Sequence, residues 1–166
     1  MYIPFDQLPD HSRLWIYASE RTFTPVEEEI IGKNLTEFCN QWTAHSTPLS
    51  TSWLVAHHCF IILAVDESSA GASGCSIDGS VRNLKALAQS IGADIFDRRN
   101  IHLLISGNLE IHPLDTLRRR FAEGRISGDD LIFDNLVATK GEWKMNWLQK
   151  VSESWAARFT SKGILA

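Results

Sequence analysis

The sequence has few cysteines, and their spacing excludes two common scaffolds of small domains. Cys39, Cys59 and Cys75 are odd in number, lie far apart and form no CxxC pair. A disulfide framework needs an even set of cysteines, and a zinc knuckle needs paired thiols. We therefore expect three free thiols, no metal site and no bound cofactor.

The sequence also lacks the segments that direct a chain into a membrane. It contains no run of about 18 apolar residues, and its N-terminus has no basic segment followed by a long apolar one. The formal net charge of −4 argues against a general polyanion binder, and the run Arg118–Arg120 is expected to be a solvated face. These features predict a cytoplasmic protein without a membrane partner, and they disfavour nucleic acid as a partner.

Two nucleotide-binding motifs are absent as well. A P-loop needs a lysine and a hydroxyl after its glycine-rich turn, but residues 71–76 contain no lysine. No GxGxxG occurs either, so a dinucleotide-binding fold has no local support. Anion binding by the bare backbone of this loop remains open.

The apolar pattern predicts one domain of the α+β class. Among the 166 residues, 44% are hydrophobic, and six Trp and eight Phe supply large core side chains. The sequence Thr24-Pro25-Val26-Glu27 is typical of a helix start with a capping box. Strands are predicted at 13–19, 52–57, 59–65 and 101–106, with helices from 24 to 42 and from Ser76 or Asp78 to Gly92. The strands at 52–57 and 59–65 either meet at a tight turn around His57 and His58 or form one long bent strand.

This order of elements indicates a ferredoxin-like split βαβ sandwich, in which helices cover one face of an antiparallel sheet. Residues 1–166 are interpreted as a single domain, with an irregular arm at 1–12, a βαββαβ core at 13–106 and a helical C-terminal extension at 107–166 that packs on the core. Within the extension we expect a short helix from Pro113 to Gly124 and a Trp-rich helical stretch from Met145 to Phe159.

The segment from Phe60 to Asp78 is the leading candidate for a site. Here a strand ends in two carboxylates, and a loop of small residues leads into a helix. The catalytic candidates are Cys75, Asp66, Glu67 and Asp78, and the ligand-binding candidates are Ser73, Gly74, Cys75 and Ser76.

A structural interpretation of the same residues is equally open, because Ser76 and Asp78 suit helix caps and cysteine is often buried. His45, His57 and His58 are candidate bases by composition, but no spacing places them beside Cys75.

Several stretches together resemble a family of small uncharacterised bacterial proteins that often carry the label "ABC transporter ATPase". They are residues 4–9, 41–45, 64–67, 71–78 and 135–137, and the stretch Gly71-Ala-Ser-Gly-Cys-Ser-Ile-Asp78 is the most distinctive. The resemblance covers nearly the whole chain. It implies a bacterial protein, and no catalytic residue is carried over from it.

The leading hypothesis is a ligand-binding or protein-interaction domain with an unknown small ligand at residues 66–78. A homodimer joined through the sheet or through the C-terminal aromatic residues is compatible with it. The alternative is a small enzyme that uses Cys75 as nucleophile, or Asp66, Glu67 and Asp78 as acid/base or metal-binding groups.

Overall fold

A computed structural model describes residues 1–44, 46–68 and 71–160 of the protein. It contains helices and antiparallel sheets, which confirms the α+β class. The first sheet has the order β1-β5-β4, and the second has the order β7-β6-β8-β9. The strands are β1 (Arg13–Ala18), β4 (Ser50–Ala56), β5 (Phe60–Asp66), β6 (Asn100–Ile105), β7 (Asn108–Pro113), β8 (Leu131–Phe133) and β9 (Leu148–Lys150), and β2 (Thr43–Ala44) and β3 (Thr47–Pro48) form a small separate hairpin.

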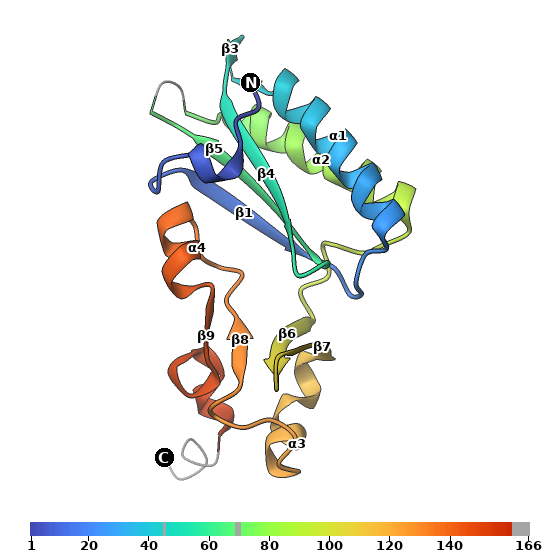
Figure 1. The fold of residues 1–166 in the computed structure, drawn as a ribbon, viewed down its shortest axis with the longest axis vertical. Coiled ribbons are helices and arrows are strands. Elements are labelled where there is room, and N and C mark those ends of the chain that lie inside the picture. The colour runs from blue at the N-terminus through green and yellow to red at the C-terminus, as the bar shows by residue number, and fades with distance from the viewer. Residues whose placement is uncertain (45, 69–70, 161–166) are drawn as a thin grey trace.

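Helices α1 (Pro25–Gln41) and α2 (Gly74–Ile91) lie side by side on one face of the first sheet (Figure 1). The predicted capping box is present in α1, where Thr24 and Glu27 each accept a backbone N–H of the other. The spacing of apolar residues in this helix predicts that Val26 and Ile30 belong to its buried stripe, but both are exposed. Each lies one residue ahead of a buried row and so about 100° around the helix. That buried row is Ile31, Leu35 and Cys39.

The β4–β5 hairpin confirms the predicted turn at His57 and His58. Both residues have positive φ, 48° and 56°, which is the conformation of a two-residue type I′ turn. Cys59 N–H donates to the carbonyl of Ala56 at 3.1 Å and closes the turn.

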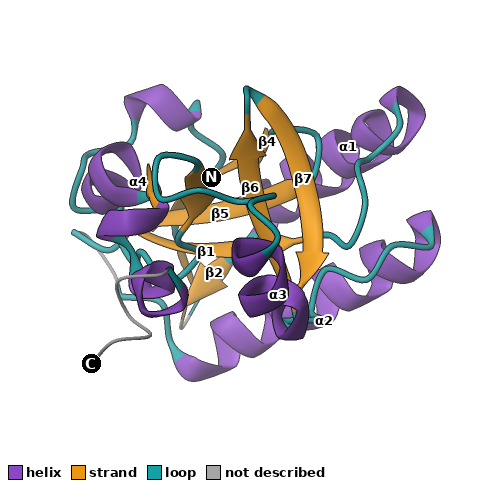
Figure 2. Ribbon diagram, turned by 90° about the horizontal axis from the view of Figure 1, so that it is seen from below, coloured by secondary structure: helices purple, strands orange, loops and turns teal. Residues whose placement is uncertain are grey.

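The other face of the first sheet is covered by the N-terminal arm and the C-terminal half of the chain. Phe60 on β5 packs against Phe133 and Trp147, with ring centroids 4.7 and 5.0 Å away. Leu8 of the arm is buried in the same cluster. Figure 2 shows β6 and β7 running across the direction of β1 and β5. The second sheet therefore packs across the first sheet, and side chains from both form the core between them.

The expectation that residues 101–106 complete the first sheet is wrong. This segment forms β6, which pairs with β7 and β8 in the second sheet, so the expected ferredoxin-like sheet of four strands is not formed. A tight turn through Ser106 and Gly107 brings β7 against β6, and a hairpin partner so near in sequence costs little loop entropy. In the ferredoxin-like order the fourth strand would lie beside the first, so β1 is left as an edge strand.

The prediction of a helical extension at 107–166 holds only in part. Its helices are α3 (Leu117–Ala122) and α4 (Lys140–Asn146), but β7, β8 and β9 lie in the same region. The predicted helix from Met145 to Phe159 stops at Asn146, because Leu148–Lys150 pairs with β8 and buries Trp147 against the first sheet. Short 3-10 turns complete the described chain at Phe5–Gln7, Leu114–Thr116, Val151–Glu153 and Trp155–Phe159.

Candidate functional site

A hydrogen-bonded group forms at the end of β5 around the carboxylate of Asp66, and its other members, Ser68 and His11, were not among the predicted site residues. Oδ1 of Asp66 accepts the N–H of Ser68 at 3.0 Å and the hydroxyl of Ser68 at 2.6 Å, and it lies 3.2 Å from Nε2 of His11. The hydrogen bonds from Ser68 lower the pKa of Asp66, and His11 lowers it further. His11 belongs to the arm, and no pattern in the sequence predicted that it would reach this loop.

These three residues do not form a catalytic Ser-His-Asp relay. In such a relay one ring nitrogen contacts the serine and the other contacts the carboxylate. Here the same Nε2 of His11 lies 2.8 Å from the Ser68 hydroxyl and 3.2 Å from Asp66. Because the Ser68 hydroxyl already donates to Asp66, it has no proton left for His11. The arrangement is a hydrogen-bonded turn at the end of a strand.

Glu67 is engaged by backbone rather than directed at a ligand. Its Oε1 accepts the N–H of Ala72 at 2.9 Å and lies 3.8 Å from the guanidinium of Arg13. The first of these contacts spans the loop from the strand to the start of α2.

Ser73, and not Ser76 or Asp78, is the N-cap of α2. Its hydroxyl oxygen accepts the N–H of Ser76 at 3.2 Å, while the Ser76 hydroxyl donates to the Ser73 carbonyl at 2.8 Å. The carbonyl of Ser76 in turn accepts the indole N–H of Trp42 at 3.0 Å. The cap lies three residues before Ser76 and five before Asp78, the two predicted caps, so Asp78 lies inside the first turns of the helix, where it is exposed. Two of the predicted ligand-binding side chains are therefore occupied by the cap.

Cys75 lies exposed in the first turn of α2 beside Gly74. The turn at His57 and His58 lies at the opposite end of β5 (Figure 1), about 20 Å along a seven-residue strand. His45 lies outside the described residues. In the described part of the chain no hydrogen bond joins Cys75 to a histidine.

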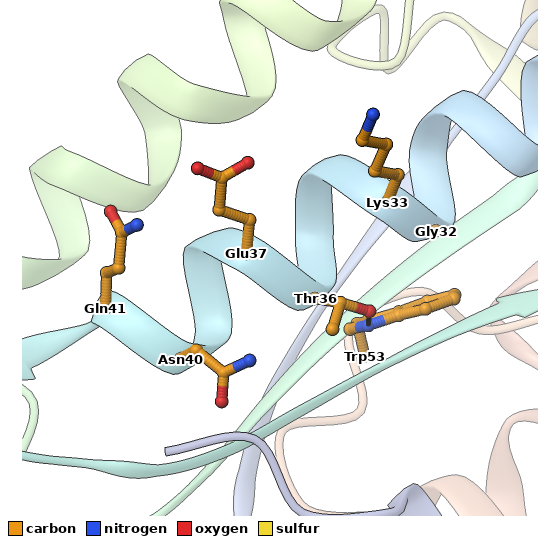
Figure 3. Close-up of a pocket in the computed structure, with 7 residues that line it drawn as sticks. All are labelled: Gly32, Lys33, Thr36, Glu37, Asn40, Gln41 and Trp53. Carbon is orange, nitrogen blue, oxygen red and sulfur yellow. Dashed lines mark hydrogen bonds between the residues drawn. The ribbon is translucent and has the colours of Figure 1, made fainter.

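A shallow hollow lies beside α1. It is lined by α1 residues and Trp53, whose indole N–H donates to the hydroxyl of Thr36 at 3.0 Å. Figure 3 shows Lys33 and Glu37 projecting from α1 on the side away from Trp53. Both charged residues line the hollow, but their side chains point away from Trp53.

A cleft between the two sheets has the better properties of a binding site. Its volume is about 440 Å³, within the usual range for ligand pockets. Strand β1 forms one side over its whole length, residues 95–102 form another, and residues 133–138 form a third. The cleft therefore lies along the edge of β1 that the expected fourth strand would have covered.

His102 on β6 lines this cleft and is only 2% exposed. Its Nε2–H donates to the carbonyl of Ser19 at 2.8 Å, because a carbonyl oxygen can only accept. Nδ1 of the neutral ring is then left as an acceptor, and this buried atom has no hydrogen-bond partner among the described residues. Burial lowers the pKa of His102, so the ring is neutral at pH 7.

The rim of the cleft is apolar. Leu114, Leu136 and Trp155 all line it, and their exposed fractions are 39%, 82% and 38%. Exposed apolar residues that are scattered singly need no explanation, but these three gather around one cleft.

Some charged groups of the cleft have a polar partner within the protein, and Arg98 differs from them. Asp97 is bound by Arg99 at 2.8 Å, and Asp134 accepts the N–H of Leu136 at 3.0 Å. Arg98 is exposed, and in the described ranges no ion pair joins it to a carboxylate. Burial raises the pKa of Tyr17 on β1, and the charge of Arg98 opposes that shift. The cleft thus presents a neutral phenol and an available cation.

No protein-family model, curated protein or solved structure matches the chain. Within the described residues, no group of three or more His, Cys, Asp or Glu side chains is placed to hold a metal ion. None of the described helices combines the length and the apolar character needed to cross a membrane.

The sequence pattern did not point to the cleft, because its parts are far apart in the chain. His102 lies in an apolar strand pattern, where a histidine is usually a satisfied core residue. The one available signal was that this strand has apolar residues on both faces and a histidine among them.

Proposed function

We propose that the protein binds an organic ligand in the cleft between its two sheets. The observation that carries this proposal is the cleft of about 440 Å³ with its apolar rim, and His102 in its wall has a buried Nδ1 without a partner among the described residues. A buried acceptor without a partner costs about 1 to 3 kcal/mol, so a ligand that donates a hydrogen bond to it gains affinity. A reducing, cytoplasmic setting is part of the proposal, and the three unpaired cysteines support it.

Two small probes that differ in one donor test the proposal. p-Cresol and toluene have the same apolar ring, but only p-cresol can donate to Nδ1. In NMR titrations at millimolar concentration, we expect p-cresol to shift the amides of Ile16 and Asn135, which line the cleft. We also expect it to bind about fivefold more tightly than toluene, the value of one net hydrogen bond.

The His102→Leu variant removes the acceptor, and the preference for p-cresol should disappear in it. The Cys75→Ser variant is the matched control at the predicted loop site, and it should bind both probes as the wild type does. Shifts that map to the loop at 66–78 or to the hollow at Trp53, with none in the cleft, would overturn the proposal.

A further inference from the structure

The edge of β1 inside the cleft carries unpaired backbone groups. Leu14 N–H points away from β5, since it donates to the carbonyl of Ala138 at 2.9 Å. Backbone groups alternate in direction along a strand, so those of Ile16 and Ala18 point the same way as those of Leu14. Strand β1 pairs along its length only with β5, and the described chain supplies no outward partner for Ile16 or Ala18.

We propose, on the basis of the cleft as the binding site, that its ligand is an extended peptide of another protein that adds to β1 as a strand. The bridge between Arg13 and Thr139 closes one end of the edge. About four residues of β1 remain open, which is about 13 Å of strand. The cleft volume of about 440 Å³ and the apolar rim suit a short stretch of chain with apolar side chains.

The charge of the cleft specifies the peptide further. Arg98 lines the cleft and has no carboxylate partner among the described residues, whereas the neighbouring Arg99 is held by Asp97. A peptide with one carboxylate beside its apolar residues complements this cation. That carboxylate is either an acidic side chain or the C-terminus of the peptide.

A second copy of the protein is a poor occupant. The edge of β1 is recessed between residues 95–102 and 133–138, so two such edges cannot approach each other closely enough to pair. A flexible peptide carries no flanking segments of this kind, so it can approach the edge of β1 closely enough to pair. The opposite edge of the sheet, at β4, is already used in part, because Thr51 bonds to Met1 at 3.1 Å and to Ile3 at 2.8 Å.

The experiment begins with selection of random hexapeptides displayed for binding to the full-length wild-type protein. The tightest peptide is then synthesised with N-methyl groups at alternate residues, in two complementary sets. An N-methyl group removes one backbone donor and leaves the side chain unchanged. We expect one set to weaken binding by at least about tenfold and the other to bind within about twofold, because only alternate residues face β1.

Two protein variants give the matched comparison. Ile16→Pro removes an outward N–H from β1, and Val55→Pro removes one from β4, where the outward direction follows from Thr51. Binding should be lost in the first and kept in the second. If Ile16→Pro does not fold, the N-methylated peptides still decide the matter on the wild-type protein.

Arg98→Gln should weaken binding several-fold, whereas Arg118→Gln, an exposed change on α3, should not. Amidating the C-terminus of the peptide distinguishes a terminal from a side-chain carboxylate. The inference is overturned if no peptide is selected, if both N-methylated sets bind equally, or if the protein forms a dimer that Ile16→Pro dissociates. Binding of p-cresol in the cleft together with any of these results would retain the proposed function and remove only the peptide.

Discussion

The stability of the protein should fall as the pH falls below about 6.5, and His102 should cause most of the loss. Burial lowers the pKa of His102 from its ordinary value of 6.5. The unfolded chain therefore takes up a proton at a higher pH than the folded chain does. The contribution of the neutral His102 ring to stability is fully present above pH 6.5 and decreases as the pH falls toward the pKa of the folded state. The upper limit for one group is about 1.4 kcal/mol per pH unit.

The carboxylates act in a separate pH window. The salt bridge with Arg21 lowers the pKa of Glu27 to about 2 from 4.5, and Arg99 lowers that of Asp97 to about 2 from 3.8. Their contributions are present above those ordinary values and are lost only as the pH falls below them. A slope between pH 6.5 and 5 is therefore assigned to histidines. His57 contributes less, because it is exposed, although burial of part of its ring lowers its pKa too.

Urea unfolding at half-unit intervals from pH 5 to 7.5 measures this slope. The His102→Gln variant keeps a donor for the Ser19 carbonyl but cannot be protonated, so its free energy of unfolding should depend far less on pH in this range. A wild type with no slope there, or a variant with the same slope as the wild type, would refute the account of His102 as a buried neutral ring.

Three further predictions concern other parts of the molecule. In the native state only Cys75 of the three thiols should react with a disulfide reagent at pH 8. Burial raises the pKa of Cys39 to about 11 and that of Cys59 to about 12, so these two thiols should not react. Reaction of two or three thiols before unfolding would contradict this burial. Lys140→Met should reduce the free energy of unfolding by about 2 to 4 kcal/mol, because the buried ammonium of Lys140 donates to the carbonyls of Asp6 and Leu8. A loss as small as that of an exposed lysine variant would argue against these hydrogen bonds. Thr24→Ala should cost about 1 kcal/mol in thermal or urea unfolding through the lost cap of α1, and an unchanged stability would show that the cap contributes nothing.

Local signals predicted the first half of the fold well. The start of α1 follows from its capping box, and Gly92 ends α2 in the left-handed conformation that glycine favours. The hairpin between β4 and β5 was predicted although its turn contains His57 and His58 instead of Asn and Gly. Each of these features depends on residues close together in sequence.

The pairing of β6 could not be predicted in the same way. An apolar pattern predicts that a segment forms a strand but not which strand it pairs with. Both sheets could have buried the apolar side chains of this segment. The alternation in Asn108–Pro113 is the signal that was missed, since apolar Leu109 and Ile111 alternate with polar Glu110 and His112 and supply a hairpin partner for β6. Once β6 pairs there, the edge of β1 is open and the cleft follows.

The candidate site shows the same limit. Across the predicted loop, the structure joins Glu67 at the end of the strand to the backbone of Ala72 just before α2. Other partners of the predicted residues, such as His11 with Asp66 and Trp42 with Ser76, come from distant parts of the chain and engage groups that the sequence left free. The role of the exposed Cys75 stays a prediction.

Amide hydrogen exchange along β1 tests the central claim most directly, because four consecutive residues report on both edges of one strand. Trp15 and Tyr17 face β5, and Ile16 and Ala18 face the cleft. In the free protein we expect Ile16 and Ala18 to exchange at least about tenfold faster than Trp15 and Tyr17, and to become protected when the selected peptide is bound. Equal protection of all four amides in the free protein, or no change at Ile16 and Ala18 with saturating peptide, would contradict an open β1 edge as the place where the ligand binds.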